Sequence, residues 1–267
     1  MLNFFRKTAL LGAVFSFLAG CAASRLPLTR PAVESRMAQH DFVRVADTPV
    51  FALLRQRAAA PLLTVYIEGD GAAWQSAYRP PVDPTPTRPV VLEMVSADPA
   101  PAVGYLARPC QFLDAPALAD CPVALWTGDR FSPEVMTRMA QALDQLKHAS
   151  GAKQLRLIGY SGGGVIATLL AGRRKDVVSL ATVAAPLRVA AWTAHHNVSR
   201  LTGDDPDALS LPLPPATHWI GADDAVVPAA LIAAYVARTG GRLVVVPGYD
   251  HSCCWSADWP RFLKELP

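Results

Sequence analysis

The chain has 267 residues, 51% of them hydrophobic and 18% charged, so it is long enough to bury a substantial core as one large domain or two small ones. The formal net charge is +3, and it falls to +1 when Arg6 and Lys7 of the predicted leader are left out. No basic stripe with interleaved aromatic residues occurs, which argues against a nucleic-acid partner.

Residues 1–20 have the pattern of a targeting signal. Arg6 and Lys7 precede an apolar run at 9–19 that is too short to span a bilayer comfortably. The run ends in Leu18-Ala19-Gly20-Cys21, which resembles the lipobox of bacterial lipoproteins. That resemblance implies cleavage before Cys21, which would then carry a thioether-linked diacylglycerol and an N-acyl chain. Two lipid signals of this kind suffice for stable anchoring to a membrane.

The residue after the cysteine bears on localisation. Ala22 in place of aspartate resembles lipoproteins that are sorted to an outer membrane, so we expect a lipid-anchored protein on the periplasmic side of a bacterial cell envelope. An ordinary cleaved signal peptide with an incidental Cys21 is the alternative.

The first half of the mature chain predicts a tether followed by strands. Residues 21–41 are polar and without clear period, and we expect a single folded domain over 42–267. Apolar runs at 42–45 and 50–54 flank a turn and predict a β-hairpin, and the β-branched run 62–67 predicts a buried strand. The proline-rich segment 80–89 can be neither helix nor inner strand, because proline lacks a backbone donor and restricts φ.

The second half alternates strand and helix signals. Further strands are expected at 103–106, 123–126, 177–183, 217–220 and 243–246, and helices at 132–148, 228–238 and 259–266. Ser132 and Pro133 have the pattern of a helix start, and Gly151 ends that helix. The mixed insertion 187–215 is a candidate lid or acyl pocket, and a plain connector is the alternative. The alternation predicts an α/β fold with a mostly parallel sheet covered on both faces.

The segment 155–167 carries the strongest chemical signal. An apolar run enters the turn Gly159-Tyr160-Ser161-Gly162-Gly163, and small residues follow with helical periodicity. The spelling matches G-x-S-x-G, in which glycines leave room for a strained strand–turn–helix corner that lifts the serine hydroxyl above the sheet. Ser161 is therefore a candidate nucleophile, and a Gly-Ser-Gly turn without catalysis is the alternative.

Two acidic turns downstream supply the partners that a serine nucleophile needs. A serine hydroxyl requires a base, a carboxylate that orients the base, and donors for the oxyanion. Asp223 and Asp224 follow one predicted strand, and His251 follows the next. This order of serine, aspartate and histidine, each at the carboxyl end of a strand, resembles the α/β-hydrolase family from about residue 42 to the end.

The resemblance to α/β-hydrolases implies a role for each residue. Ser161 would be the nucleophile, His251 the general base, and Asp224 the acid of the pattern G-x-x-D-x-V-V-P at 221–228. The adjacent Asp223 is the rival for the acid. The alternative is that the aspartates are solvated turn residues and His251 a loop histidine.

The same resemblance implies an oxyanion hole. One donor would be the N–H of Gly162 and the second the N–H of Asp70, with Gly69 and Gly71 allowing the turn. Glu68 stands where many family members have histidine. Two explanations for acidic side chains beside a developing anion are open: the carboxylates point away into hydrogen bonds with the backbone, or one of them is protonated in the site.

Four cysteines remain after Cys21, and an envelope compartment permits disulfides. Cys110 and Cys121 bracket a short loop and are natural partners, and closing that loop is worth up to about 3 kcal/mol in the chain-entropy model. Cys253 and Cys254 are open to three interpretations: a vicinal pair, bonds to the other two cysteines, or free thiols. We expect no metal, because the spacings do not match a zinc or redox motif and because the pair at 195–196 lacks a nearby Cys/His set.

Taken together, the motifs predict a membrane-anchored serine hydrolase that needs no cofactor. Its substrate would be a small-molecule or lipid-like acyl ester, thioester or amide, and the fold does not choose among them. Two alternatives are open: a non-catalytic envelope lipoprotein that uses the scaffold for binding, and an acyltransferase. The sequence does not determine the oligomeric state.

Overall fold

The computed structural model describes residues 28–73, 79–88, 90–209 and 212–267. The predicted leader and Cys21 lie outside these described residues. The described part forms an eight-stranded sheet in the order β1-β2-β4-β3-β5-β6-β7-β8. The strands are β1 (Val43–Arg44), β2 (Ala52–Gln56), β3 (Leu62–Ile67), β4 (Ala102–Leu106), β5 (Gln154–Tyr160), β6 (Val177–Val183), β7 (Ala216–Gly221) and β8 (Arg242–Val246).

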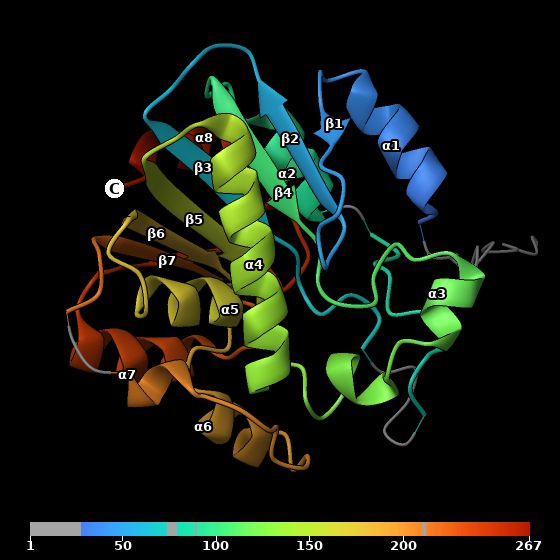
Figure 1. Ribbon diagram of the computed structural model, residues 1–267. Helices are drawn as coiled ribbons and strands as arrows, with labels where there is room; N and C mark the ends of the chain where they lie inside the picture. Colours follow the sequence, from blue (N-terminus) through green and yellow to red (C-terminus); the bar gives the residue numbers. More distant parts are fainter. Residues whose placement is uncertain (1–27, 74–78, 89, 210–211) are drawn as a thin grey trace, which may run out of the picture.

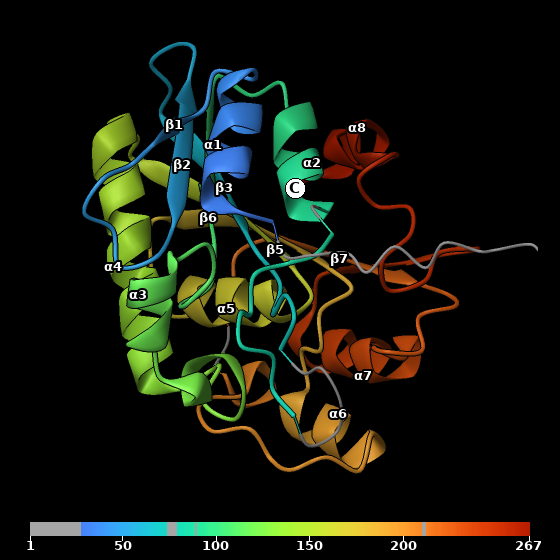
Figure 2. The same ribbon diagram turned by 90° about the vertical axis from the view of Figure 1, so that its right-hand side faces the viewer.

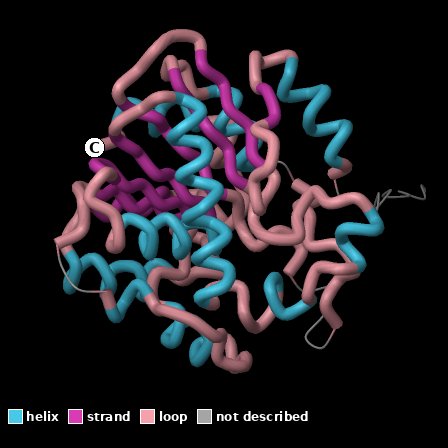
Figure 3. Tube along the Cα trace, in the orientation of Figure 1, coloured by secondary structure: helices cyan, strands magenta, loops and turns pink. Residues whose placement is uncertain are grey.

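The sheet is mostly parallel, as predicted. β1 and β2 form the expected hairpin, with Val43 opposite Leu54, and β2 runs antiparallel to β4. From β4 to β8 every neighbouring pair is parallel. The strands gather in the middle of the molecule with the helices outside them (Figure 3).

Helices cover both faces of the sheet (Figures 1 and 2). They are α1 (Arg30–Ala38), α2 (Val90–Ala97), α3 (Ala115–Ala119), α4 (Pro133–Ser150), α5 (Gly162–Ala171), α6 (Val189–His195), α7 (Ala229–Thr239) and α8 (Trp259–Phe262), with short 3₁₀ turns η1 (Val123–Trp126), η2 (Pro206–Ala208) and η3 (Leu263–Glu265). No described helix has the length and apolar character needed to cross a membrane.

Strand side chains divide between two cores because successive residues of a strand point to opposite faces. Along β3, Leu63, Val65 and Ile67 lie in the core under α4 and α5. Tyr66 lies in the other core, where Trp259 of α8 donates to its hydroxyl oxygen at 2.8 Å. With both faces buried, the carboxyl ends of the parallel strands are left as the edge on which loops can build a site.

The predicted caps of α4 are confirmed. The Ser132 side chain accepts a hydrogen bond from the Val135 N–H, Pro133 occupies the first turn, and Gly151 ends the helix at φ 69°.

Two predictions about local structure are wrong. The segment 21–41 is not tether throughout, because α1 buries Val33 and Met37, which lie four residues apart and form one narrow apolar stripe on a polar helix. The segment 123–126 is a 3₁₀ turn instead of a strand. Leu125 donates to the carbonyl of Pro122, so this chain bends back on itself instead of joining the sheet. Helices α2, α3 and α6 were not predicted.

Candidate active site

Ser161 stands on a strained corner between β5 and α5. Its backbone has φ 50° and ψ −126°, a conformation that side-chain-bearing residues rarely adopt, and its N–H donates to the carbonyl of Val183 at 2.8 Å. The corner packs so closely on β3 that a methyl group on Gly163 would overlap the carbonyls of Ile67 and Glu68. The glycines after Ser161 are therefore required for the approach of α5 to the sheet.

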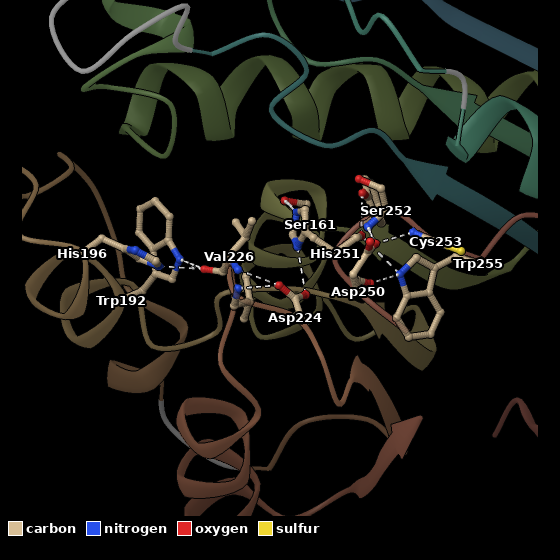
Figure 4. A network of polar contacts seen from close by, with 12 residues as sticks. Ser161, Trp192, His196, Asp224, Val226, Asp250, His251, Ser252, Cys253 and Trp255 are labelled. Atoms are coloured by element: carbon tan, nitrogen blue, oxygen red, sulfur yellow. Dashed lines mark hydrogen bonds and ion pairs between the residues drawn. The ribbon is translucent and has the colours of Figure 1, made fainter. Parts of the chain in front are cut away.

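A continuous hydrogen-bonded chain links Ser161 to a buried carboxylate (Figure 4). The Ser161 Oγ lies 3.1 Å from Nε2 of His251, and Nδ1 of His251 lies 2.9 Å from Oδ2 of Asp224. The three side chains come from three loops at the carboxyl ends of β5, β7 and β8. This geometry lets His251 take a proton from the serine while Asp224 orients the ring.

The structure distinguishes between the two adjacent aspartates. The Asp224 side chain is fully buried, and its Oδ1 accepts from the N–H groups of Val226 at 2.9 Å and Val227 at 2.7 Å, which leaves Oδ2 for His251. Asp223 is exposed, and its own N–H donates to the Tyr249 carbonyl. Asp224 is thus the aspartate that contacts the histidine.

Hydrogen bonds between side chains and backbone also hold the loop that carries His251. The His251 carbonyl accepts from the Tyr160 hydroxyl at 2.9 Å and from the Trp255 indole at 3.2 Å. Burial raises the pKa of Tyr160, so its hydroxyl remains a donor throughout the neutral range. Asp250 accepts from the N–H groups of Ser252 and Cys253, each at 2.7 Å, and these bonds lower the pKa of Asp250.

The predicted oxyanion loop lies beside the Ser161 corner. Among the described residues, the N–H groups of Gly162 and Asp70 have no hydrogen-bond partner, so both are free to donate to a ligand. Gly71 has φ 63°, and a side chain there would overlap the carbonyl of Pro84. Gly69 packs on Tyr160 and Ser161, which places the loop against the nucleophile.

The carboxylates of Glu68 and Asp70 in this loop both accept hydrogen bonds from neighbouring protein groups. Glu68 is buried and accepts from the Gly69 N–H and the Tyr105 hydroxyl, both at 2.9 Å. Desolvation raises the pKa of Glu68 to about 7 although these two bonds and the nearby Arg108 oppose the shift. Asp70 accepts from Arg108 at 2.8 Å and from Arg130 at 3.0 Å. Glu68 therefore fits both explanations from the sequence, since it accepts a backbone hydrogen bond and its protonated form is favoured by burial. Asp70 fits neither, because it pairs with two arginine side chains.

Two pockets meet at Ser161, and Asp70, Gly71 and His251 line both of them. One, of about 190 Å³, has a mixed lining that also includes the polar or charged residues Thr87, Arg88 and Ser252. The other, of about 250 Å³, is mainly apolar, and its lining includes Phe131, Val189, Trp192, Leu201 and Val227. Three of these residues, Val189, Trp192 and Leu201, belong to the predicted insertion 187–215, which therefore walls one side of the candidate site.

The insertion is tied to the loop of the buried aspartate. The indole of Trp192 donates to the Val226 carbonyl at 2.7 Å, and Nε2 of His196 contacts the same oxygen at 2.8 Å, which requires the tautomer or ion with a proton on Nε2 (Figure 4). His195 is exposed. In the described part of the chain no group of three or more His, Cys, Asp or Glu residues is arranged to hold a metal ion.

The four cysteines in the described part form two disulfides. Cys110 bonds to Cys121, and Cys253 bonds to its neighbour Cys254 in the His251 loop. Sequence reasoning missed the residues behind the oxyanion loop: Tyr105, Arg108, Gln111 and Arg130. The only signal near them in the sequence was the loop bracketed by Cys110 and Cys121, which contains Gln111 and begins two residues after Arg108.

Comparison with solved structures shows the fold. The chain is similar to Est1E from Butyrivibrio proteoclasticus, with 14% identity, a TM-score of 0.54, and coverage of 84% of this chain and 98% of that one. It is similar to the esterase Pf2001 from Pyrococcus furiosus, with 13% identity, a TM-score of 0.59 and coverage of 86% and 95%. It is also similar to an α/β serine hydrolase homologue from Coxiella burnetii, with 14% identity, a TM-score of 0.52 and coverage of 84% and 94%.

Searches with protein-family models and against curated proteins gave no match. The structural similarities, together with the strand order, confirm the predicted α/β-hydrolase fold.

Proposed function

We propose that this chain is a serine hydrolase that cleaves carboxylic esters through an acyl-enzyme intermediate. The observation that carries the proposal is the unbroken chain of hydrogen bonds from Ser161 through His251 to the buried Asp224, built on a strained corner. Such an arrangement is costly to maintain, because it combines a positive φ at a serine with a buried carboxylate. The esterases with the same fold support the choice of an ester substrate.

The proposed reaction uses the same groups in acylation and in deacylation, with His251 acting first as base and then as acid in each half. His251 Nε2 accepts the proton of Ser161 as Oγ attacks the acyl carbonyl, and Asp224 stabilises the resulting imidazolium. The N–H groups of Gly162 and Asp70 stabilise the negative oxygen of the tetrahedral intermediate. The histidine then protonates the departing alcohol, and water repeats the sequence to release the acid.

The two pockets suggest how a substrate would be divided. We infer that the apolar pocket lined by Phe131, Val189 and Trp192 receives the acyl chain, and that the pocket of mixed lining beside Arg88 receives the alcohol. Each pocket is smaller than the range of about 300–1,000 Å³ that is usual for drug-sized ligands. We therefore expect short acyl chains to be preferred, with butyrate esters hydrolysed faster than octanoate or palmitate esters.

Labelling with a fluorophosphonate tests the proposal, because the probe reacts only with an activated serine. The wild type is expected to be labelled and to hydrolyse p-nitrophenyl butyrate, and Ser161→Ala is expected to lose both properties. Ser199→Ala, at an exposed serine that lines neither pocket, is the matched control. A folded wild type that is neither labelled nor active would favour the non-catalytic binding scaffold. Product analysis with added acceptor alcohols separates hydrolysis from acyl transfer.

We further propose that Cys21 is lipidated and that the enzyme is tethered to the outer membrane on its periplasmic side. The support is the sequence Leu18-Ala19-Gly20-Cys21 followed by Ala22. Metabolic labelling with a clickable palmitate analogue, followed by membrane fractionation, tests this. Cys21→Ser is expected to lose the label and the membrane association, and a variant that stays lipid-labelled contradicts the proposal.

A further inference from the structure

A buried cluster of charges lies behind the oxyanion loop and is not used by the triad. The Asp70 carboxylate accepts from Arg108 at 2.8 Å and from Arg130 at 3.0 Å, and the arginine side chains are only 4% and 7% exposed. Two guanidinium groups share one carboxylate, so these three side chains carry a net charge of +1, which the nearby Glu68 offsets when it is ionised. Within the described residues, Nε of each arginine is buried without a hydrogen-bond partner. Burying charges in this way adds little to the free energy of unfolding, so we look for a functional reason for the cluster.

The cluster contacts the nucleophile corner directly. The Asp70 carboxylate packs against Gly162, and a methyl group on that glycine would overlap it. Asp70 and Arg130 also line the apolar pocket beside Ser161. The Asp70 carboxylate, with its two guanidinium partners behind it, therefore lies next to the position where the proposed oxyanion would form, in surroundings that screen charge little.

A second tie holds the peptide group that precedes Asp70. The Gln111 side chain donates to the Gly69 carbonyl at 3.1 Å and accepts from the Arg108 N–H at 3.0 Å. The Gly69 carbonyl and the Asp70 N–H belong to one planar trans peptide, in which they point in opposite directions. Holding the carbonyl therefore also sets the direction of the N–H that is proposed to donate to the oxyanion.

The segment 108–131, which supplies these hydrogen bonds, is cross-linked internally. Cys110, between Arg108 and Gln111, is bonded to Cys121. The Arg108 guanidinium also donates to the Arg130 carbonyl and lies 5.4 Å from the centre of the Phe131 ring. The segment 108–131 therefore presents both arginines to Asp70 as one closed unit.

We propose that Arg108, Gln111 and Arg130 are positioning residues of the oxyanion hole. They hold the Gly69–Asp70 peptide in place, and the two guanidinium groups neutralise the Asp70 carboxylate that would otherwise repel the developing oxyanion. This inference rests on the proposed function, because it assigns a role in the same ester hydrolysis.

The test compares turnover with substrate binding. Arg130→Gln is expected to lower kcat on p-nitrophenyl butyrate by about 10–100-fold and to change KM by less than about threefold, since a transition-state interaction is lost. Arg130→Lys, which keeps the charge, is expected to recover part of kcat. Gln111→Met, which releases the Gly69 carbonyl without altering charge, is expected to lower kcat about tenfold. Arg138→Gln, at an exposed ion pair on α4, is the control and should match the wild type.

A purely structural role would reduce the folded fraction and leave kcat per folded molecule unchanged. The inference is overturned if Arg130→Gln and Gln111→Met are folded by circular dichroism and keep kcat within about twofold of the wild type. Where Arg130→Gln does not fold, Arg130→Lys and Gln111→Met decide. A wild type that hydrolyses no ester and resists the fluorophosphonate contradicts the proposed function instead, so the two failures are distinguishable.

Discussion

The two sides of Ser161 are supported in different ways. On the histidine side, carboxylates bind backbone N–H groups two or three residues away, as Asp224 does with Val226 and Val227. On the oxyanion side, Asp70 binds side chains that lie 38 and 60 residues away in the sequence. The first kind of support is a local turn that any fold can carry. The second exists only when distant segments have been brought together.

The difference predicts how each side fails. A local turn keeps its shape when one side chain is replaced by an isostere, so variants on the histidine side should lose chemistry and keep the fold. The oxyanion loop depends on long-range packing, so variants that break its packing or its contacts with distant side chains should lose turnover and stability together. The following predictions test this contrast from the largest expected effect on turnover to the smallest.

Replacing the buried carboxylate should have the largest effect. Asp224→Asn keeps the shape of the turn but favours the wrong tautomer of His251, and kcat for ester hydrolysis is expected to fall by about 10⁴-fold. The control Asp223→Asn, at the exposed neighbour, should keep kcat within about twofold of the wild type. Steady-state kinetics measures both. Equal losses in the two variants would show that the contact with His251 does not orient the base.

Filling the oxyanion turn should have an intermediate effect. Gly71→Ala places a methyl group against the Pro84 carbonyl at a positive φ, so the loop must shift. We expect kcat to fall by about 10²-fold and the free energy of unfolding to fall by about 2–3 kcal/mol. Gly128→Ala is the control, since open space surrounds that glycine. Urea unfolding and kinetics on both variants check this, and a Gly71→Ala protein of wild-type stability would contradict the predicted loss of packing.

The same contrast explains what could be predicted from the sequence. Ser161, Asp224 and His251 lie in turns whose signals are local, each following an apolar strand, so their order and place could be inferred. Most of the sheet could be inferred for the same reason, since most of its strands contain a short apolar run.

The remaining features depend on tertiary contacts. Arg108 and Arg130 have no local pattern that connects them with Asp70. The ionisation of Glu68 depends on how deeply β3 and β4 bury it beside Tyr105. Helix α1 was missed because only two buried residues, Val33 and Met37, mark its inner face.

Loosening the insertion should have a small effect. His196→Ala removes one of the two donors to the Val226 carbonyl, while Trp192 keeps the other. A single hydrogen bond of this kind is worth about 1 kcal/mol, so we expect a stability loss of that size and a decrease in kcat of less than about fivefold. His195→Ala, at the exposed neighbour, should change neither quantity. A loss of kcat as large as that of Asp224→Asn would mean that the insertion takes a direct part in the chemistry.

Neutralising Glu68 should leave turnover nearly unchanged and alter the pH dependence of stability. The pKa of Glu68 is raised from 4.5 to about 7, so folding favours the protonated form. Its contribution to the free energy of unfolding is therefore fully present below about pH 4.5 and is lost as the pH rises through 7. The loss amounts to about 3 kcal/mol, at about 1.4 kcal/mol per pKa unit.

Glu68→Gln can accept from the Gly69 N–H and bond to Tyr105 as the wild type does, but it carries no charge to desolvate. The variant is expected to lack this decrease in stability between pH 5 and 8, to be more stable than the wild type at pH 8, and to keep kcat within about threefold. Urea unfolding of both proteins across this pH range measures the difference. Parallel pH profiles would show that Glu68 is ionised in the fold at neutral pH, and the oxyanion loop would then hold two negative charges, on Glu68 and Asp70.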